Sequence, residues 1–383
     1  MDPALQPIAD KVHAHERLTA EEAAVLLETP DLYTLGELAN AVRLRMHGRA
    51  TYYNVNRHMN YSNVCALSCK FCAFHRKKGD TDAYEHDVDR IRLEAMQATE
   101  AGATEMHIVG GLHPYLPFSY YTDMIAAIRE AAPSVHVKAF TAVEIVHLAR
   151  ISKRAKDIPG VLQDLKDAGL GSLPGGGAEV FDDRVHDEAF KGKIRSDKWL
   201  EVHREAHNLG LMSNATMLYG HVESLEDRIH HFMLLREEQD RAINEGLPGR
   251  FQTLIPLPFI PDDSELGHLP GPQGLENLRM LAVARLVLDN FDHIKAFWIM
   301  QTVGLSQVAL DWGVDDMDGT IVWYDITKLG GTSTHQEVTV ATLRHAIREA
   351  GYVPVERDTL YRRIERDGPS WRLADQPRPA EVA

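Results

Sequence analysis

Residues 63–74 read Asn-Val-Cys-Ala-Leu-Ser-Cys-Lys-Phe-Cys-Ala-Phe, and they hold all three cysteines of the 383-residue chain, Cys65, Cys69 and Cys72. The spacing of these cysteines is C-x3-C-x2-C. An odd number of cysteines so close together is a poor framework for disulfides. The pattern therefore favours a reducing compartment and a set of thiolate ligands for a metal.

Four interpretations of the cysteines are open from the residues alone. A closed zinc site needs a fourth ligand, which His75 offers, although the gap between the first two cysteines is unusual for a zinc finger. A ferredoxin-type cluster takes four thiolates, and the chain has three. Three buried apolar cysteines would not explain the clustering. The fourth interpretation, which we favour, is a four-iron cluster with one iron open to a small molecule, because an open position marks a catalytic metal site.

The chain as a whole is acidic, with 56 Asp and Glu residues, 41 Lys and Arg residues and a net charge of −15. This charge argues against nucleic acid or an anionic membrane as the partner. Apolar residues make up 44% and charged residues 25%, the balance of a globular protein. The sequence has no run of about 18 apolar residues and no apolar core of a secretory signal at its start. We therefore expect a cytoplasmic protein.

From residue 52 onward, short apolar runs alternate with helical stretches. The expected strands are 52–58, 104–109, 135–140, 170–173, 212–218, 251–256, 294–299 and 319–323. The expected helices are 85–101, 118–131, 143–168, 196–209, 224–240, 274–290 and 303–312. Such alternation predicts an α/β fold with a parallel sheet, and eight strands over this length match the ~250 residues of a (β/α)8 barrel. A partial barrel of six units is the fallback.

The chain is expected to divide into four segments. They are a helical N-terminal extension at 1–50, the barrel at 51–323, a C-terminal cap region at 324–365 with a helix at 340–350, and a flexible tail at 366–383. Thr19 and Thr34 are each followed three residues later by Glu, so each predicts a helix start with a capping box. The tail is rich in Pro and polar residues, which predicts fraying.

Several polar residues and glycines are expected at the C-terminal ends of the strands, where a parallel barrel carries its active site. The cysteine loop follows the first expected strand, and Gly110-Gly111 follows the second, where glycines let a ligand approach the backbone. Lys138 lies among apolar neighbours on the third strand, which is unusual for a buried strand, so we expect it to face the barrel mouth and bind an anion. Asn214 is expected to face the lumen from the fifth strand.

The cysteine spacing, with the aromatic Phe71 before the last cysteine, resembles the signature of the radical S-adenosylmethionine (SAM) enzymes. Further blocks resemble one branch of that superfamily, the aminofutalosine synthases of the futalosine route to menaquinone. These blocks are 56–65, 107–114, 138–145, 173–179, 214–221 and 355–361, and the resemblance runs from about residue 18 to 361. Similar relatives are dehypoxanthine futalosine cyclase and the deazaflavin synthase subunits.

The resemblance implies roles for individual residues. Cys65, Cys69 and Cys72 would bind a [4Fe-4S] cluster whose unique iron chelates SAM. Gly110 and Gly111 would accept the amino group of SAM, and Glu144 would contact its ribose or ammonium group. Phe71 and Asn214 complete the expected cofactor-binding set.

The resemblance also implies a reaction. The 5′-deoxyadenosyl group derived from SAM adds to 3-[(1-carboxyvinyl)oxy]benzoate, giving 6-amino-6-deoxyfutalosine, methionine and bicarbonate. The substrate carries two carboxylates, which call for cationic or amide partners, and Arg57, His58 and Lys138 are the candidates. An external electron donor such as flavodoxin or ferredoxin would reduce the cluster. The alternatives are a cyclase-like radical SAM enzyme that starts by hydrogen abstraction and, outside catalysis, an iron–sulfur carrier.

The sequence departs from the family pattern after Asp318-Gly319-Thr320. The family usually continues there with a Glu pair and a nearby His, whereas this chain reads Ile-Val-Trp-Tyr-Asp-Ile-Thr-Lys at 321–328. The resemblance therefore implies no contact from this segment.

Overall fold

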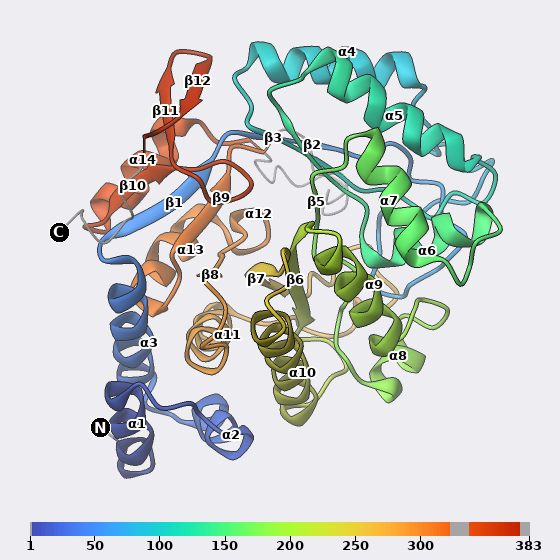
Figure 1. Cartoon of the computed structure of the whole chain (residues 1–383). Coiled ribbons are helices and arrows are strands. Elements are labelled where there is room, and N and C mark those ends of the chain that lie inside the picture. The colour runs from blue at the N-terminus through green and yellow to red at the C-terminus, as the bar shows by residue number, and fades with distance from the viewer. Residues whose placement is uncertain (1, 322–336, 376–383) are drawn as a thin grey trace.

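A curled sheet of seven parallel strands lies at the centre of the computed structural model, which describes residues 2–321 and 337–375 (Figure 1). The strands pair in the order in which they occur in the chain. They are β2 (Asn56–Met59), β3 (Glu105–Ile108), β4 (His136–Ala139), β5 (Ser172–Leu173), β6 (Met212–Tyr219), β7 (Phe251–Pro258) and β8 (His293–Ile294). Every pairing between neighbours is parallel, so all the carboxyl ends of these strands meet at one edge.

An eighth strand position joins the two ends of this sheet. Strand β9 (Asp316–Gly319) pairs in parallel with β1 (Ala50–Asn54), which leads into β2 after a single residue. Asp316 also bridges to Lys295, the residue directly after β8. The structure thus confirms the expected parallel β/α barrel and places eight strand positions around it.

Helices cover the outside of the strands (Figure 1). They are α4 (Val88–Glu100), α5 (Phe118–Ala131), α6 (Ala142–Ile151), α7 (Ile158–Ala168), α8 (Asp183–Ala189), α9 (Ser196–Asn208), α10 (Leu225–Asn244), α11 (Gly274–Val287) and α13 (Val303–Ala309), followed by a 3-10 turn at Leu310–Trp312. The short α12 (Trp298–Gln301), which follows β8, is instead mostly buried. In the part of the chain that the structure describes, none of the helices is long and apolar enough to cross a bilayer.

Four of the expected elements differ from the structure. The helix expected at 143–168 is two helices, because Asp157 caps a new start at α7 with Pro159 in its first turn. The first expected strand is divided into β1 and β2. The strand expected at 294–299 ends at Ile294, and a short helix begins at Trp298. The last strand lies at 316–319 rather than 319–323, because its acidic residues did not match an apolar pattern.

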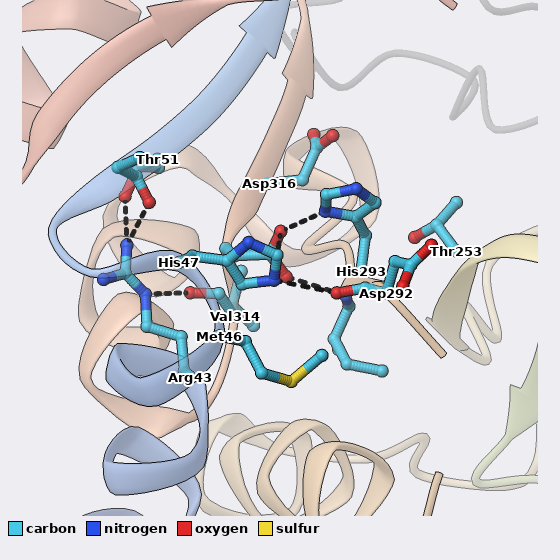
Figure 2. A network of polar contacts seen from close by, with 12 residues as sticks. Arg43, Met46, His47, Thr51, Thr253, Asp292, His293, Val314 and Asp316 are labelled. Atoms are coloured by element: carbon cyan, nitrogen blue, oxygen red, sulfur yellow. Dashed lines mark hydrogen bonds and ion pairs between the residues drawn. The ribbon is translucent and has the colours of Figure 1, made fainter. Parts of the chain in front are cut away.

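The N-terminal extension is helical as expected, with a 3-10 turn at Pro3–Leu5 before α1 (Gln6–Ala14), α2 (Ala20–Glu28) and α3 (Leu32–His47). Thr19 forms the predicted capping box, whereas Asp31 rather than Thr34 caps α3. Buried Arg43 ties α3 to the barrel, since it donates to the Ala50 carbonyl at 2.7 Å and to the Thr51 hydroxyl at 2.6 Å (Figure 2).

The C-terminal region contains more structure than expected. Helix α14 (Val340–Glu349) matches the prediction, and β10 (Val353–Glu356) adds to the free edge of β1. The tail prediction was wrong for residues 366–373, because β11 (Ile364–Asp367) and β12 (Ser370–Leu373) form an antiparallel hairpin. Most of the irregular segment expected at 324–338 lies outside the described residues.

A buried polar network joins α3 to the barrel at the N-terminal side of β8 and β9 (Figure 2). Asp315 accepts from His293 Nδ1 at 2.6 Å and from the buried guanidinium of Arg285. His47 Nε2 lies 2.8 Å from the carbonyl oxygen of Asp292, so this nitrogen must carry a proton. His47, His293 and Asp315 have the residue types and proximity of a metal site. Asp315 is instead paired with His293 and Arg285, and His47 with the carbonyl of Asp292, so the network is structural.

Several histidines are buried in their uncharged form, so we expect the folded protein to lose stability at acidic pH. Burial lowers the pKa of His47 and His136 to about 4, and that of His58, His207 and His231 to about 3. The unfolded chain therefore binds more protons below pH 6.5, the ordinary value, and stability falls as pH falls. We expect the free energy of unfolding to be level above this pH and to drop by about 1.4 kcal/mol per pH unit for each such histidine below it.

Anaerobic urea titrations at a series of pH values between 4 and 8 would measure this slope. Replacing the exposed His230 by Gln should leave it unchanged, whereas His207→Gln should reduce it. A stability that is flat across the acidic range would contradict the prediction.

Candidate active site

One cavity at the carboxyl ends of the strands collects most of the predicted site residues. Those that line it are Cys65, Cys69, Cys72, Phe71, Gly110, Gly111, Lys138, Glu144 and Asn214. They come from the loops after β2 and β3, from β4, from the first turn of α6 and from β6. Residues far apart in sequence thus meet in one place, as a parallel barrel predicts.

Two predicted residues, Arg57 and His58, are not among the described residues that line the cavity. His58 pairs in register with His107, and His107 with Lys138, so these three side chains share the inner face of the sheet. The centre of the His58 ring lies 4.3 Å from the centre of the His107 ring, and His107 does line the cavity. Arg57 has the opposite parity and pairs with Met106, so it belongs to the outer face.

The cysteine loop is held by the backbone around it. The Cys65 amide donates to the Arg76 carbonyl at 2.9 Å, and Lys77 Nζ donates to the carbonyls of Cys65 and Leu67 at 3.0 and 2.9 Å. The Cys65 sulfur accepts from the amides of Leu67 and Leu112, both at 3.4 Å. These contacts hold the Cys65 sulfur in place at the end of β3, and the thiolate form of a cysteine is the one that binds metal.

The chemistry of the three sulfurs fits a metal cluster. Burial raises the pKa of the Cys69 thiol to about 11, while the nearby Lys193 ammonium acts in the opposite direction. A thiolate in this position therefore needs further positive charge, which iron would supply. The three cysteines would hold the cluster, and they line the same cavity as the other predicted site residues.

Gly110 and Gly111 are required where the cysteine loop crosses the end of β3. A Cβ atom on Gly111 would lie 2.3 Å from the carbonyl oxygen of Val64, and one on Gly110 would lie 2.6 Å from the ring of Tyr61. Neither position tolerates a side chain without moving the loop that carries the cysteines. The glycine pair therefore sets the distance between the cysteine loop and the β3 end.

Glu144 organises this corner of the cavity. Its Oε1 accepts from the Tyr61 hydroxyl at 2.9 Å and from the Gly110 amide at 3.0 Å, and its Oε2 accepts from the Thr141 amide at 2.7 Å and hydroxyl at 2.8 Å. Burial raises the pKa of Glu144 to about 7, against the effect of these donors. Both oxygens are thus occupied by protein groups, so the geometry makes Glu144 a positioning residue for the glycine pair.

Replacing Glu144 by Gln is expected to destabilise the protein by about 1–3 kcal/mol, because the new NH2 group would face donors instead of accepting from them. We also expect weaker SAM binding, since Gly110 loses its support. Urea unfolding and equilibrium binding of SAM would measure both effects. Glu130→Gln, on the exposed face of α5, is the matched control and should change neither. Unchanged SAM affinity in Glu144→Gln would contradict the positioning role.

Two lysines of the cavity were missed in the sequence. Lys193 pairs with Glu179, and its Nζ lies 5.1 Å from the centre of the Phe71 ring. Glu179 and the thiols of Cys69 and Cys72 raise its pKa, against the effect of burial, so it stays charged. Lys295 lies directly after β8, where it interrupts an apolar run just as Lys138 does on β4. That shared pattern was the available signal for Lys295, whereas no pattern pointed to Lys193.

Comparisons with known proteins agree with this site. The family model described as "Radical SAM superfamily" matches residues 59–235, and the one described as "CofH/MqnC C-terminal region" matches 249–369. An aminodeoxyfutalosine synthase of Thermus thermophilus is 46% identical over 369 residues, covering 95% of this chain and 96% of the relative. The aminodeoxyfutalosine synthase of Streptomyces coelicolor is 41% identical and covers 100% of both chains.

More distant relatives share the fold. A 5-amino-6-(D-ribitylamino)uracil–L-tyrosine 4-hydroxyphenyl transferase of Methanopyrus kandleri is 35% identical over 88% of this chain and 90% of its own. Among solved structures, methylornithine synthase has a TM-score of 0.69 at 17% identity, covering 91% of this chain and 97% of that one. The hydrogenase maturase HydG of Carboxydothermus hydrogenoformans has a TM-score of 0.70 at 16% identity, covering 93% and 80%.

Proposed function

The chain belongs to the radical SAM superfamily, and we propose that it is an aminodeoxyfutalosine synthase. The reaction joins the 5′-deoxyadenosyl group of SAM to 3-[(1-carboxyvinyl)oxy]benzoate, with uptake of water and release of methionine and bicarbonate. The observation that carries the proposal is the single cavity that unites the cysteine loop, the glycine pair and buried cationic side chains. The identity to two aminodeoxyfutalosine synthases over nearly their whole length supports the substrate.

Residues that line the cavity are candidates for holding the cluster and SAM. Cys65, Cys69 and Cys72 would hold a [4Fe-4S] cluster, which supplies the electron that cleaves SAM. Gly110 and Gly111 offer backbone groups to the amino group of SAM, and Asn214, 4% exposed, offers an amide. The protein's own contribution is to orient SAM and its partner and to keep water from the reacting atoms.

The substrate carboxylates would meet cationic groups on the inner face of the sheet. Lys138 is 4% exposed and lines the cavity, so it is the proposed substrate contact among the three candidates of the sequence. We propose that His58 acts only through His107, which separates it from the cavity. The outward parity of Arg57 gives it no place in the proposed site.

The proposal also covers the electron donor and the cellular compartment of the enzyme. Reduction of the cluster calls for an external one-electron donor, for which a flavodoxin or ferredoxin is suitable. Oxygen-sensitive clusters and unpaired cysteines fit the cytoplasm.

An anaerobic assay tests the function. The protein is reconstituted with iron and sulfide and mixed with dithionite, SAM and 3-[(1-carboxyvinyl)oxy]benzoate, and the products are identified by mass spectrometry. Formation of 6-amino-6-deoxyfutalosine is the expected result. Release of free 5′-deoxyadenosine without the adduct would indicate a cyclase-like enzyme that abstracts hydrogen. No SAM cleavage by a fully loaded cluster would indicate an iron–sulfur carrier.

A further inference from the structure

Two buried ammonium groups lie on the inner wall of the cavity, on β4 and directly after β8. We propose that Lys295, together with Lys138, binds the ring carboxylate of the substrate, and that Asp318 positions Lys295 for this contact. The inference rests on the proposed function, because it assigns one end of that substrate. It adds a specificity-determining residue, Lys295, that was not among the candidates drawn from the sequence.

Burial makes these lysines unusual. Lys295 is 2% exposed and Lys138 is 4% exposed, and both line the cavity. Burying an ammonium group is costly unless a partner compensates it, so such residues are rare without a role. Each ammonium has three N–H donors, of which a single carboxylate uses only part. The remaining donors are available to a ligand in the cavity.

The two lysines have different counterions. Lys138 Nζ lies 2.7 Å from Glu105 Oε1, and Glu105 is 0% exposed and is not among the described residues that line the cavity. Lys295 Nζ lies 3.3 Å from Asp318 Oδ1, and Asp318 itself lines the cavity. Lys138 is thus paired with a carboxylate outside the cavity lining, whereas Lys295 is paired, at a longer distance, with a carboxylate that lines the cavity. An incoming carboxylate can contact Lys295 beside Asp318.

The backbone at Asp318 supports a functional role for this pair. Asp318 has φ +61°, in the left-handed region that residues other than glycine rarely adopt, and its amide donates to Asp316 Oδ1 at 2.6 Å. Strained backbone of this kind persists where the surrounding structure enforces it, and it clusters at binding sites. Here the strain turns a carboxylate toward Lys295 at the cavity wall.

The chemistry of the reaction decides which carboxylate these lysines bind. The carboxylate on the vinyl group leaves as bicarbonate, so its bond to carbon must break during the reaction. Ammonium donors on that group would stabilise the ground state more than the transition state and would slow the reaction. The ring carboxylate keeps its charge from substrate to product, so strong binding there raises affinity without this penalty.

The walls of the cavity agree with this orientation. Ile255 and Leu257 of β7 and Phe297, which follows Lys295 by two residues, line the cavity with apolar surface that suits an aromatic ring. The lysines lie at the level of the strands, whereas the cysteines lie in the loop beyond β2. The ring carboxylate at the lysines therefore leaves the vinyl end directed toward the cysteine loop.

The test compares two compounds, 3-[(1-carboxyvinyl)oxy]benzoate and 2-phenoxyacrylate, which lacks only the ring carboxylate. We expect Lys295→Ala to raise KM and the dissociation constant of the first compound by about 10- to 100-fold, with kcat little changed. Both constants for 2-phenoxyacrylate should be unchanged. Steady-state kinetics gives KM and kcat, and isothermal titration calorimetry gives the dissociation constant. Each is measured for both compounds, with wild type and with the variant.

Three further variants keep the test decisive. Lys295→Arg retains the charge and should restore most of the affinity. The double variant Lys295→Met/Asp318→Asn removes both members of the ion pair, so it avoids a buried unpaired carboxylate if the single variant fails to fold. Like Lys295→Ala, it should bind the dicarboxylate more weakly than wild type does and bind 2-phenoxyacrylate as wild type does. Lys198→Ala, on the surface of α9, is the control and should behave as wild type.

Distinct results would overturn the inference and the proposed function. Equal weakening of both compounds by Lys295→Ala, or a loss of kcat at unchanged KM, would remove the ring-carboxylate assignment while the function stands. Binding of the dicarboxylate by wild type without any adduct would remove the proposed function. If wild type neither binds nor converts the dicarboxylate, the inference and the proposed function are both wrong.

Discussion

Replacing any one of Cys65, Cys69 and Cys72 by Ala is expected to reduce SAM cleavage and product formation to background. Three thiolates are the fewest that hold a four-iron cluster with one open iron, and the chain has no fourth cysteine to substitute. The measurement is iron content, the ultraviolet–visible spectrum and SAM cleavage after anaerobic reconstitution. Each variant should lose all three signals together.

The control is Ser68→Ala, an exposed position in the same loop, which should retain the cluster and the activity. Circular dichroism should show that all the variants keep the fold, because most of the apolar core is formed by the strands and helices of the barrel and not by the cysteine loop. A variant such as Cys69→Ala that still cleaves SAM at the wild-type rate would refute the assignment of the cluster ligands.

Replacing Asp315 by Ala is expected to lower the free energy of unfolding by about 3–5 kcal/mol. Asp315 and Arg285 are both 0% exposed at the side chain, and Asp315 also accepts from His293 and from the Ile294 amide at 2.9 Å. The variant would leave a buried guanidinium without its carboxylate. Urea unfolding monitored by tryptophan fluorescence would measure the loss.

The neighbouring Asp292 provides a matched control for this prediction. Its side chain is 52% exposed and pairs with Arg250 on the surface at 3.1 Å, so Asp292→Ala should cost less than about 1 kcal/mol. The double variant Arg285→Met/Asp315→Leu removes both charges and should recover part of the stability. A loss of less than 1 kcal/mol in Asp315→Ala would show that the network in Figure 2 does not hold α3 to the barrel.

Much of the fold was predictable because its signals are local. The alternation of apolar runs and helical stretches identified the parallel barrel, and the expected helix at 118–131 matches α5. The last strand was misplaced because Asp315, Asp316 and Asp318 make it read as a loop. Each of these acids is buried only because a cation from elsewhere in the chain meets it, respectively Arg285, Arg357 and Lys295.

Long-range pairing also explains the error in the C-terminal tail. Residues 366–373 have the composition of a frayed end, yet β11 and β12 pair with each other, and Arg366 forms an ion pair with Glu356 at the end of β10. The sequence shows neither contact. A polar segment becomes ordered when its charges find fixed partners, and composition alone does not reveal them.

The three cysteines, the glycine pair and Lys138 could be found from their order in the chain, because spacing, a strand end and a charge within an apolar run are local features. Which neighbours of these residues face the cavity depends on how the strands come together. Strand parity separates Arg57 from His58, and the curvature of the sheet brings Lys295 and Asp318 into the cavity that Lys138 lines. A ligand site is made by side chains that converge in space, and this convergence depends on the register and closure of the whole barrel.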